Sequence, residues 1–109
     1  MNLKLVAAEI IEQIESGKYS NIALNEYFIK YKFSNKEKGF ITEIVYGYLR
    51  NKMFVDFIIL RYAEKIKKKE IFYIIAVSIY QLYFMKQDSA GIVWEACDIL
   101  KKKYGGKVA

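Results

Sequence analysis

Apolar side chains recur along this chain at three- and four-residue intervals, the spacing that places them on one face of a helix. The first such stripe occupies residues 3–14, and Gly17 follows it where a glycine commonly ends a helix. A second stripe occupies residues 23–31, and Ser20 or Asn21 is expected to cap its helix. The pattern therefore predicts two amphipathic helices joined by a short connection at Gly17.

The segment 34–50 carries the clearest helix signals in the chain. Ser34 and Glu37 fit the S-x-x-E capping box, in which each side chain accepts a hydrogen bond from a free backbone N–H of the first turn. A wide apolar stripe follows and contains Gly47, where glycine costs roughly 1 kcal/mol relative to alanine. A glycine at this point predicts that a neighbouring helix approaches closely.

The next part of the chain predicts a bend and a fourth helix. Residues 48–57 hold no single stripe, so a bend is expected near Asn51. A new stripe over residues 55–62 predicts the fourth helix. The polar run 65–70 is interpreted as a connection or a helix start.

Residues 71–85 form the longest apolar run, which predicts a buried central helix. Its 15 residues fall short of the roughly 20 that span a membrane, so no membrane partner is expected. Asp88 or Ser89 should cap a sixth helix, which ends at Gly105 and Gly106. Six helices without a strand pattern predict an all-α bundle, with residues 1–109 as a single domain.

Composition narrows the possible chemistry. The net charge is +6 and the isoelectric point about 9.3, which favours an acidic partner but also fits a lysine-rich solubilising surface. The chain has no histidine, no metal-ligand spacing and no glycine-rich nucleotide loop, so no catalytic residue, metal or cofactor is expected. The single cysteine, Cys97, indicates a reducing, cytoplasmic location and is expected to be a buried thiol.

Three polar side chains on the apolar helices are expected to join helices. Glu43 and Glu95 should form hydrogen bonds or ion pairs between helices, with Arg50 as one possible partner. Gln81 lies inside the longest apolar run and should hydrogen bond to a neighbouring helix.

Lysine and arginine clusters at predicted helix ends are candidate contacts for phosphate groups. Arg50 is the best single candidate, although an internal ion pair is an equally good interpretation. Solvated helix ends are the alternative for the lysines. The candidate RNA-binding residues are Lys36, Lys38, Arg50, Lys52, Lys67, Lys68, Lys69, Lys101 and Lys102.

Four blocks carry a family resemblance: GKYSNIALNEYF, FITEIVYGYLR, IYQLYFM and IVWEACDILKK. In order and spacing they resemble the NusB-like RNA-binding domain, and in particular the form at the N-terminus of bacterial 16S ribosomal-RNA cytosine-5 methyltransferases of the Sun/Fmu type. The resemblance implies an all-α NusB-like bundle. It also implies one more helix after Gly106, which a chain that stops at Ala109 is expected to lack. An apolar patch should then be exposed, and a weak homodimer or a partner contact should cover it.

The resemblance implies a non-catalytic domain that binds or orients ribosomal RNA, or braces a C-terminal methyltransferase domain of the parent chain. That parent would use S-adenosylmethionine, and the 109-residue chain would neither bind it nor transfer methyl groups. One alternative is a free-standing antitermination factor that binds RNA with a ribosomal-protein partner. Another is a structural docking domain without RNA contact. The arginine-rich first helix that helps NusB bind RNA is replaced here by a helix with only Lys4, which fits the methyltransferase-linked branch better.

Overall fold

The described part of the protein, a computed structural model, covers residues 2–62, 68–85 and 87–104 of the 109. Over these residues it has helices and turns but no strand, which confirms the predicted all-α fold. The helices are α1 (Leu3–Glu15), α2 (Ser20–Lys30), α3 (Asn35–Arg50), α4 (Lys52–Tyr62), α5 (Lys69–Phe84) and α6 (Ser89–Tyr104).

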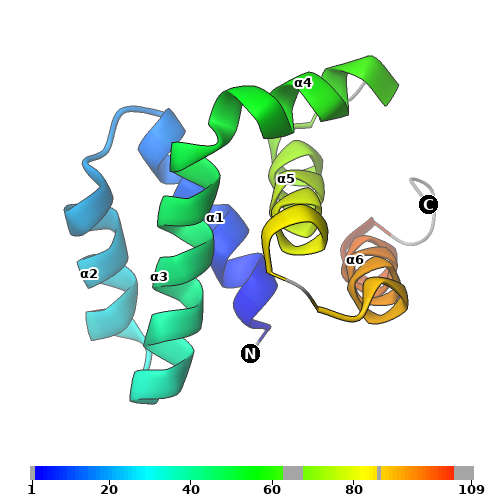
Figure 1. Cartoon of the computed structure of the whole chain (residues 1–109). Helices are drawn as coiled ribbons and strands as arrows, with labels where there is room; N and C mark the ends of the chain where they lie inside the picture. Colours follow the sequence, from blue (N-terminus) through cyan, green and yellow to red (C-terminus); the bar gives the residue numbers. More distant parts are fainter. Residues whose placement is uncertain (1, 63–67, 86, 105–109) are drawn as a thin grey trace.

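Helix α1 is the centre of the bundle. It packs against α3 and α5 and more lightly against α2, while α6 packs on the far side of α5 (Figure 1). Ala7, Ile10 and Ile11 of α1 are fully buried, because this helix has neighbours on most of its surface. Helix α4 lies across one end of the bundle, and the end of α2 and start of α3 lie at the opposite end (Figure 1).

The local signals at helix ends mostly act as predicted. The Ser34 hydroxyl accepts from the backbone N–H of Glu37 at 3.1 Å, and the Glu37 carboxylate accepts from that of Ser34 at 2.8 Å, so the capping box is confirmed. Gly17 follows α1 with a φ of 118°, which favours glycine. Asp88 caps α6 by accepting from the Gly91 N–H at 3.0 Å.

One predicted cap is wrong, and two predicted boundaries are only partly covered. Helix α2 begins at Ser20 after the extended residue Tyr19, and no side chain caps it, because Ser20 has already entered the helix. Helix α5 begins at Lys69, while residues 63–67 of the polar connection lie outside the described residues. The expected end of α6 at 105–106 also lies outside them.

Gly47 confirms the prediction of a close approach, and the approaching group is a side chain. A Cβ added to Gly47 would overlap the hydroxyl and ring of Tyr80, which reaches across from α5. The Tyr80 hydroxyl donates a hydrogen bond of 2.6 Å to the Glu43 carboxylate, one turn before Gly47 on α3. Glu43 therefore joins α3 to α5, as expected for a carboxylate on this helix.

Candidate nucleic-acid interface

The segment 27–38, here called the 27–38 corner, contains four aromatic residues, four lysines and one glutamate. Its rings contact one another in series along the end of α2 and the connection to α3. The centroid distances are 5.9 Å for Tyr27–Tyr31, 6.2 Å for Tyr31–Phe33 and 5.9 Å for Phe28–Phe33. The four rings therefore form one continuous cluster, which is half-buried and packs partly against the core.

Two lysines of the corner lie over these rings. The Nζ atom of Lys30 is 5.3 Å from the Tyr31 ring centroid, and that of Lys38 is 5.7 Å from the Phe28 centroid. Both distances fall within the range of cation–π attraction, which holds the charged groups along the aromatic surface. Lys32 and Lys36 are exposed. The corner thus combines lysine cations, which attract phosphate groups, with aromatic rings of the kind on which bases stack.

The connection between α2 and α3 explains how this surface forms. Helix α2 ends at Lys30, and Tyr31 takes an extended conformation, with φ −121° and ψ 146°. The connection therefore places Tyr31 and Phe33 against Tyr27 and Phe28 of α2. The capping box at Ser34 then starts α3 within a few residues. The corner's carboxylate, Glu37, is used in that capping box.

A pocket of about 190 Å³ opens between α1 and the end of α2. It is lined by Asn2, Leu5, Val6, Glu9, Tyr27 and Tyr31. The Tyr27 hydroxyl donates to the Glu9 carboxylate at 3.1 Å and accepts from the Gln13 side chain at 3.3 Å. Burial, followed by the Glu9 charge, raises the pKa of Tyr27 to about 12, so this phenol remains a donor at neutral pH.

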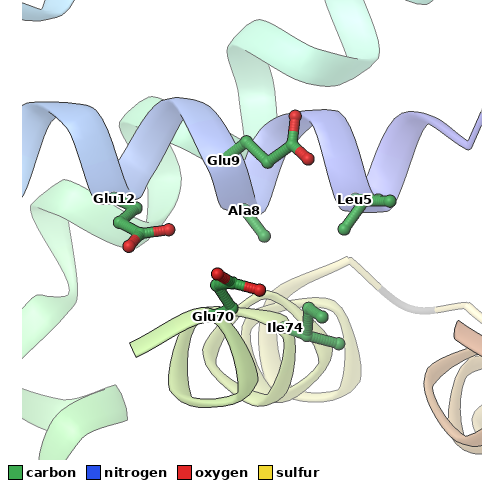
Figure 2. A pocket seen from close by; sticks show the side chains of 6 residues that line it. All are labelled: Leu5, Ala8, Glu9, Glu12, Glu70 and Ile74. Carbon is green, nitrogen blue, oxygen red and sulfur yellow. The ribbon is translucent and has the colours of Figure 1, made fainter. Parts of the chain in front are cut away.

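An acidic surface bounds the pocket on its other side. Glu9 and Glu12 of α1 and Glu70 of α5 lie around Ala8 and Ile74, where they line a cavity of about 10 Å³ (Figure 2). That space suits about one water molecule. Within the described residues, no group of three or more histidine, cysteine or acidic side chains is arranged to hold a metal ion. The carboxylates instead disfavour a phosphate on this side of the pocket.

The candidate basic residues do not form one patch. Lys36 and Lys38 lie at the 27–38 corner, whereas Arg50 and Lys52 lie at the other end of α3, about 18 Å along the helix from Lys38. The remaining described candidates are Lys68 and Lys69, at the start of α5, and Lys101 and Lys102, on α6. Lys67 lies outside the described residues.

Several of these cations are engaged inside the molecule. Lys52 bridges Asp56 at 2.7 Å and Glu15 at 3.0 Å, and these hydrogen bonds raise its pKa. Lys102 pairs with Asp98 at 3.2 Å. Such pairs reduce the charge that Lys52 and Lys102 offer to a ligand.

Arg50 is exposed and lies beside the Tyr80 hydroxyl. Burial and the hydrogen bond to Glu43 raise the pKa of Tyr80 to about 12, while Arg50 acts in the opposite direction. The structure therefore places Arg50 next to the Tyr80–Glu43 contact between α3 and α5.

Lys4 is buried, with 1% of its surface exposed, and it holds α6 against α1. Its Nζ donates to the Ile92 carbonyl at 3.1 Å and lies 4.0 Å from the Glu95 carboxylate, which also accepts from the Asn2 side chain at 3.3 Å. Burial lowers the pKa of Lys4 to about 8, although Glu95 opposes this effect. Glu95 thus joins two helices as predicted, with Lys4 and Asn2 as partners in place of Arg50.

Two other sequence predictions need correction. Cys97 is exposed, because it lies on the side of α6 away from the buried Ile92 and Ile99. Gln81 is buried as expected, but its amide donates at 3.0 Å to Gln87, in the connection before α6 rather than in a helix.

Lys30, Lys32 and Tyr31 of the corner are not among the candidate residues predicted from the sequence. The signal was present in the alternation of aromatic residues and lysines in YFIKYKF, residues 27–33. The helical spacing of Tyr27, Phe28 and Tyr31 instead predicts a helix stripe. The extended residue Tyr31 breaks the helix and brings the rings together.

Comparison with known proteins agrees with this architecture. The model of the NusB family matches residues 1–109, and the chain belongs to that family. A protein from Bacillus subtilis (strain 168), "Probable ribosomal RNA small subunit methyltransferase B", is 29% identical over 100 residues, which cover 88% of this chain and 22% of that protein. The chain thus spans about a fifth of the relative's length. No solved structure matches the chain. Among the described helices, none is long and apolar enough to cross a membrane.

Proposed function

We propose that this chain is a non-catalytic domain that binds 16S ribosomal RNA and orients it for the methyltransferase domain of a longer cytoplasmic protein. Membership of the NusB family and the similarity to a ribosomal-RNA methyltransferase support the proposal. The observation that carries it is the 27–38 corner, where lysines lie over a continuous series of rings. Methyl transfer, and S-adenosylmethionine with it, belong in this proposal to the rest of the longer protein.

The corner suits unpaired RNA better than a duplex. Lysines along a groove follow the phosphate backbone, and exposed aromatic rings stack on bases that are free of pairing. The corner has lysines and no arginine, and a lysine ammonium acts as a flexible point charge rather than as a planar fork that matches a base edge. Phosphate contacts should therefore supply most of the affinity, and binding should weaken steeply with salt.

A titration of the 109-residue chain against a fluorescein-labelled single-stranded RNA tests the proposal. Anisotropy measured at about 50 and 200 mM salt should show an affinity that falls with salt. Replacing three of the corner's four lysines in the K30Q/K32Q/K36Q variant should reduce both the affinity and the salt slope. The K101Q/K102Q variant is the control, because it removes charge from α6. Absence of binding by the parent at about 50 mM salt would contradict the RNA-binding function.

A docking role is a second candidate, and the outer face of α4 favours it. Met53, Phe57 and Leu60 project from α4 into solvent, with exposed fractions of 88% and 61% for the first two. Val55 and Ile59, on the opposite side of the same helix, are buried. A helix that is apolar on both sides is typical of one covered on both sides. We infer that the outer face, here called the α4 face, contacts another part of the longer protein.

The two roles separate in one experiment. Adding the methyltransferase domain of the longer protein as a separate chain should shift the backbone NMR signals of the α4 face and leave those of the 27–38 corner unchanged. An M53S/F57S variant should lose this response and keep its RNA affinity. Equal shifts at both ends of the bundle would contradict an α4 docking surface.

A further inference from the structure

We propose that the pocket between α1 and the end of α2 is a subsite for one unpaired nucleobase that carries an exocyclic amino group, with guanine as the best fit. This inference rests on the proposed RNA-binding function and adds what that function lacks, a determinant of base identity. The pocket adjoins the 27–38 corner directly, because Tyr27 and Tyr31 belong to both.

The walls of the pocket suit a flat heterocycle. Leu5 and Val6 of α1 form an apolar side, and the rings of Tyr27 and Tyr31 form an aromatic side. Both tyrosines are half-buried, and their rings contact each other at 5.9 Å, so neighbouring groups restrict their movement. A base that enters this space of about 190 Å³ exchanges water for apolar and aromatic contacts on its two faces.

Glu9 supplies the base selectivity. An ionised carboxylate only accepts hydrogen bonds and has about four lone-pair positions, of which the Tyr27 hydroxyl takes one. The other polar lining residue, Asn2, already accepts from the Leu5 N–H and donates to Glu95. Guanine presents two adjacent N–H donors, cytosine and adenine present one amino group, and uracil presents a single N–H between two carbonyls that a carboxylate repels. The expected order of affinity is therefore guanine first and uracil last.

The surrounding charges set the position of the nucleotide's phosphate. Lys30 and Lys32 flank Tyr31 in the chain, and the Lys30 ammonium lies over the Tyr31 ring. On the other side, Glu12 and Glu70 lie close to Glu9 (Figure 2). A phosphate is attracted to the lysines and repelled by these carboxylates. The backbone of the bound strand should therefore pass over the end of α2.

The test uses labelled RNA strands of about ten uridines in which the central base is uracil, adenine, cytosine or guanine. With the parent chain, the guanine strand should bind about tenfold more tightly than the all-uracil strand, a factor typical of one well-placed base. Y31A should lose this advantage, and Y31F should keep it because the ring remains. The melting temperatures of both variants establish that they are folded.

Substitution of Glu9 tests the hydrogen bonds themselves. E9Q keeps the size of the side chain and an oxygen that accepts from Tyr27, but it removes the negative charge, so the preference for guanine over uracil should fall to about twofold or less. E12Q is the matched control, since Glu12 lies one turn further along α1 and does not line this pocket. The preference should persist in E12Q.

The outcomes distinguish the two proposals. Salt-dependent binding with equal affinity for all four strands, or a preference for uracil, would overturn the base pocket and leave the RNA-binding function intact. A guanine preference that survives in both Y31A and E9Q would place base recognition elsewhere and overturn the pocket as well. Absence of binding to every strand at about 50 mM salt would overturn the RNA-binding function itself.

Discussion

The 27–38 corner and the α4 face lie at opposite ends of α3 (Figure 1). The four rings of the corner are half-buried, whereas Met53 and Phe57 of α4 are exposed. At the corner, lysine ammonium groups lie over the rings. On α4, two of the three charged side chains, Lys52 and Asp56, pair with each other, and Arg61 remains exposed near the helix end. Apolar side chains at the surface alone therefore do not identify a ligand. The charges beside it separate a surface suited to RNA from one suited to protein.

The way each surface is built differs as well. The corner forms where an extended residue, Tyr31, ends α2 and lets the rings of the connection, Tyr31 and Phe33, meet Tyr27 and Phe28 of that helix. The α4 face forms where the chain bends at Asn51, whose side-chain amide donates to the Gly47 carbonyl at 2.9 Å. Helix α4 begins one residue later and lies across the end of the bundle (Figure 1).

The largest expected effect concerns the contact between α3 and α5 at Gly47. Gly47→Leu should lower the free energy of unfolding by about 3 kcal/mol, because its side chain would overlap the Tyr80 ring and break the Tyr80–Glu43 hydrogen bond. Urea unfolding measures this change. Gly39→Ala is the control, since a Cβ there meets open space and should stabilise α3 by up to about 1 kcal/mol. Parent-like stability of Gly47→Leu would contradict the close packing.

The next effect is a change in stability with pH that depends on Lys4. Its pKa is about 8 in the folded protein and 10.5 when unfolded, so the unfolded chain binds more protons between these values. The contribution of Lys4 to stability, measured as the difference between the parent and Lys4→Met, should therefore rise by about 2 kcal/mol between pH 8 and 10. Above pH 10 stability should fall as pH rises, because Tyr27 and Tyr80 have a pKa of about 12 in the folded protein and 10 in the unfolded chain. Thermal unfolding of Lys4→Met should lack the rise, and a rise of equal size in that variant would contradict the assignment to Lys4.

A smaller effect locates the RNA along α3. Lys36→Gln should weaken binding of single-stranded RNA severalfold at about 50 mM salt, because it removes a phosphate contact from the corner. Arg50→Ala, at the other end of α3, should weaken it by less than twofold and mainly lower the melting temperature through the lost contact with Tyr80. Loss of RNA binding by Arg50→Ala at an unchanged melting temperature would move the RNA site toward the α4 end.

The smallest effect on stability is expected on the α4 face. Phe57→Ser should change the free energy of unfolding by no more than about 0.5 kcal/mol, since most of this side chain is already in solvent. Urea unfolding of the variant and the parent measures this change. A loss of about 1 kcal/mol or more in the variant would contradict the exposed position of Phe57.

Local signals made much of the fold predictable. The capping box at Ser34, the glycine after α1 and the clash at Gly47 each depend on a few neighbouring residues, and each is confirmed. Side chains whose partners lie far away in the chain were less predictable. Lys4 reaches Ile92 across 88 residues, and this contact depends on how α1 and α6 are both placed against α5.

The candidate site was predictable only in part, for the same reason. Lys36 and Lys38 were identified as cations at a helix start, which is a local feature. Their aromatic neighbours depend on the turn at Tyr31, and the pocket depends on how the end of α2 meets α1. Cys97 was expected to be buried because it lies beside the apolar stripe of α6. It is exposed, since a residue beside the stripe faces solvent when its helix packs on one side only.

The central position of α1 has a consequence for synthesis on the ribosome. Helix α1 is made before α3 and α5, yet those later helices cover its apolar side, and α5 ends at Phe84. At about 5–20 residues per second, the ribosome needs several seconds to make the chain between the ends of α1 and α5. During that time Ile10 and Ile11, fully buried in the finished fold, remain open to chaperones and to other nascent chains. The domain should therefore fold in a late, cooperative step once α5 has left the exit tunnel, rather than helix by helix from its N-terminus.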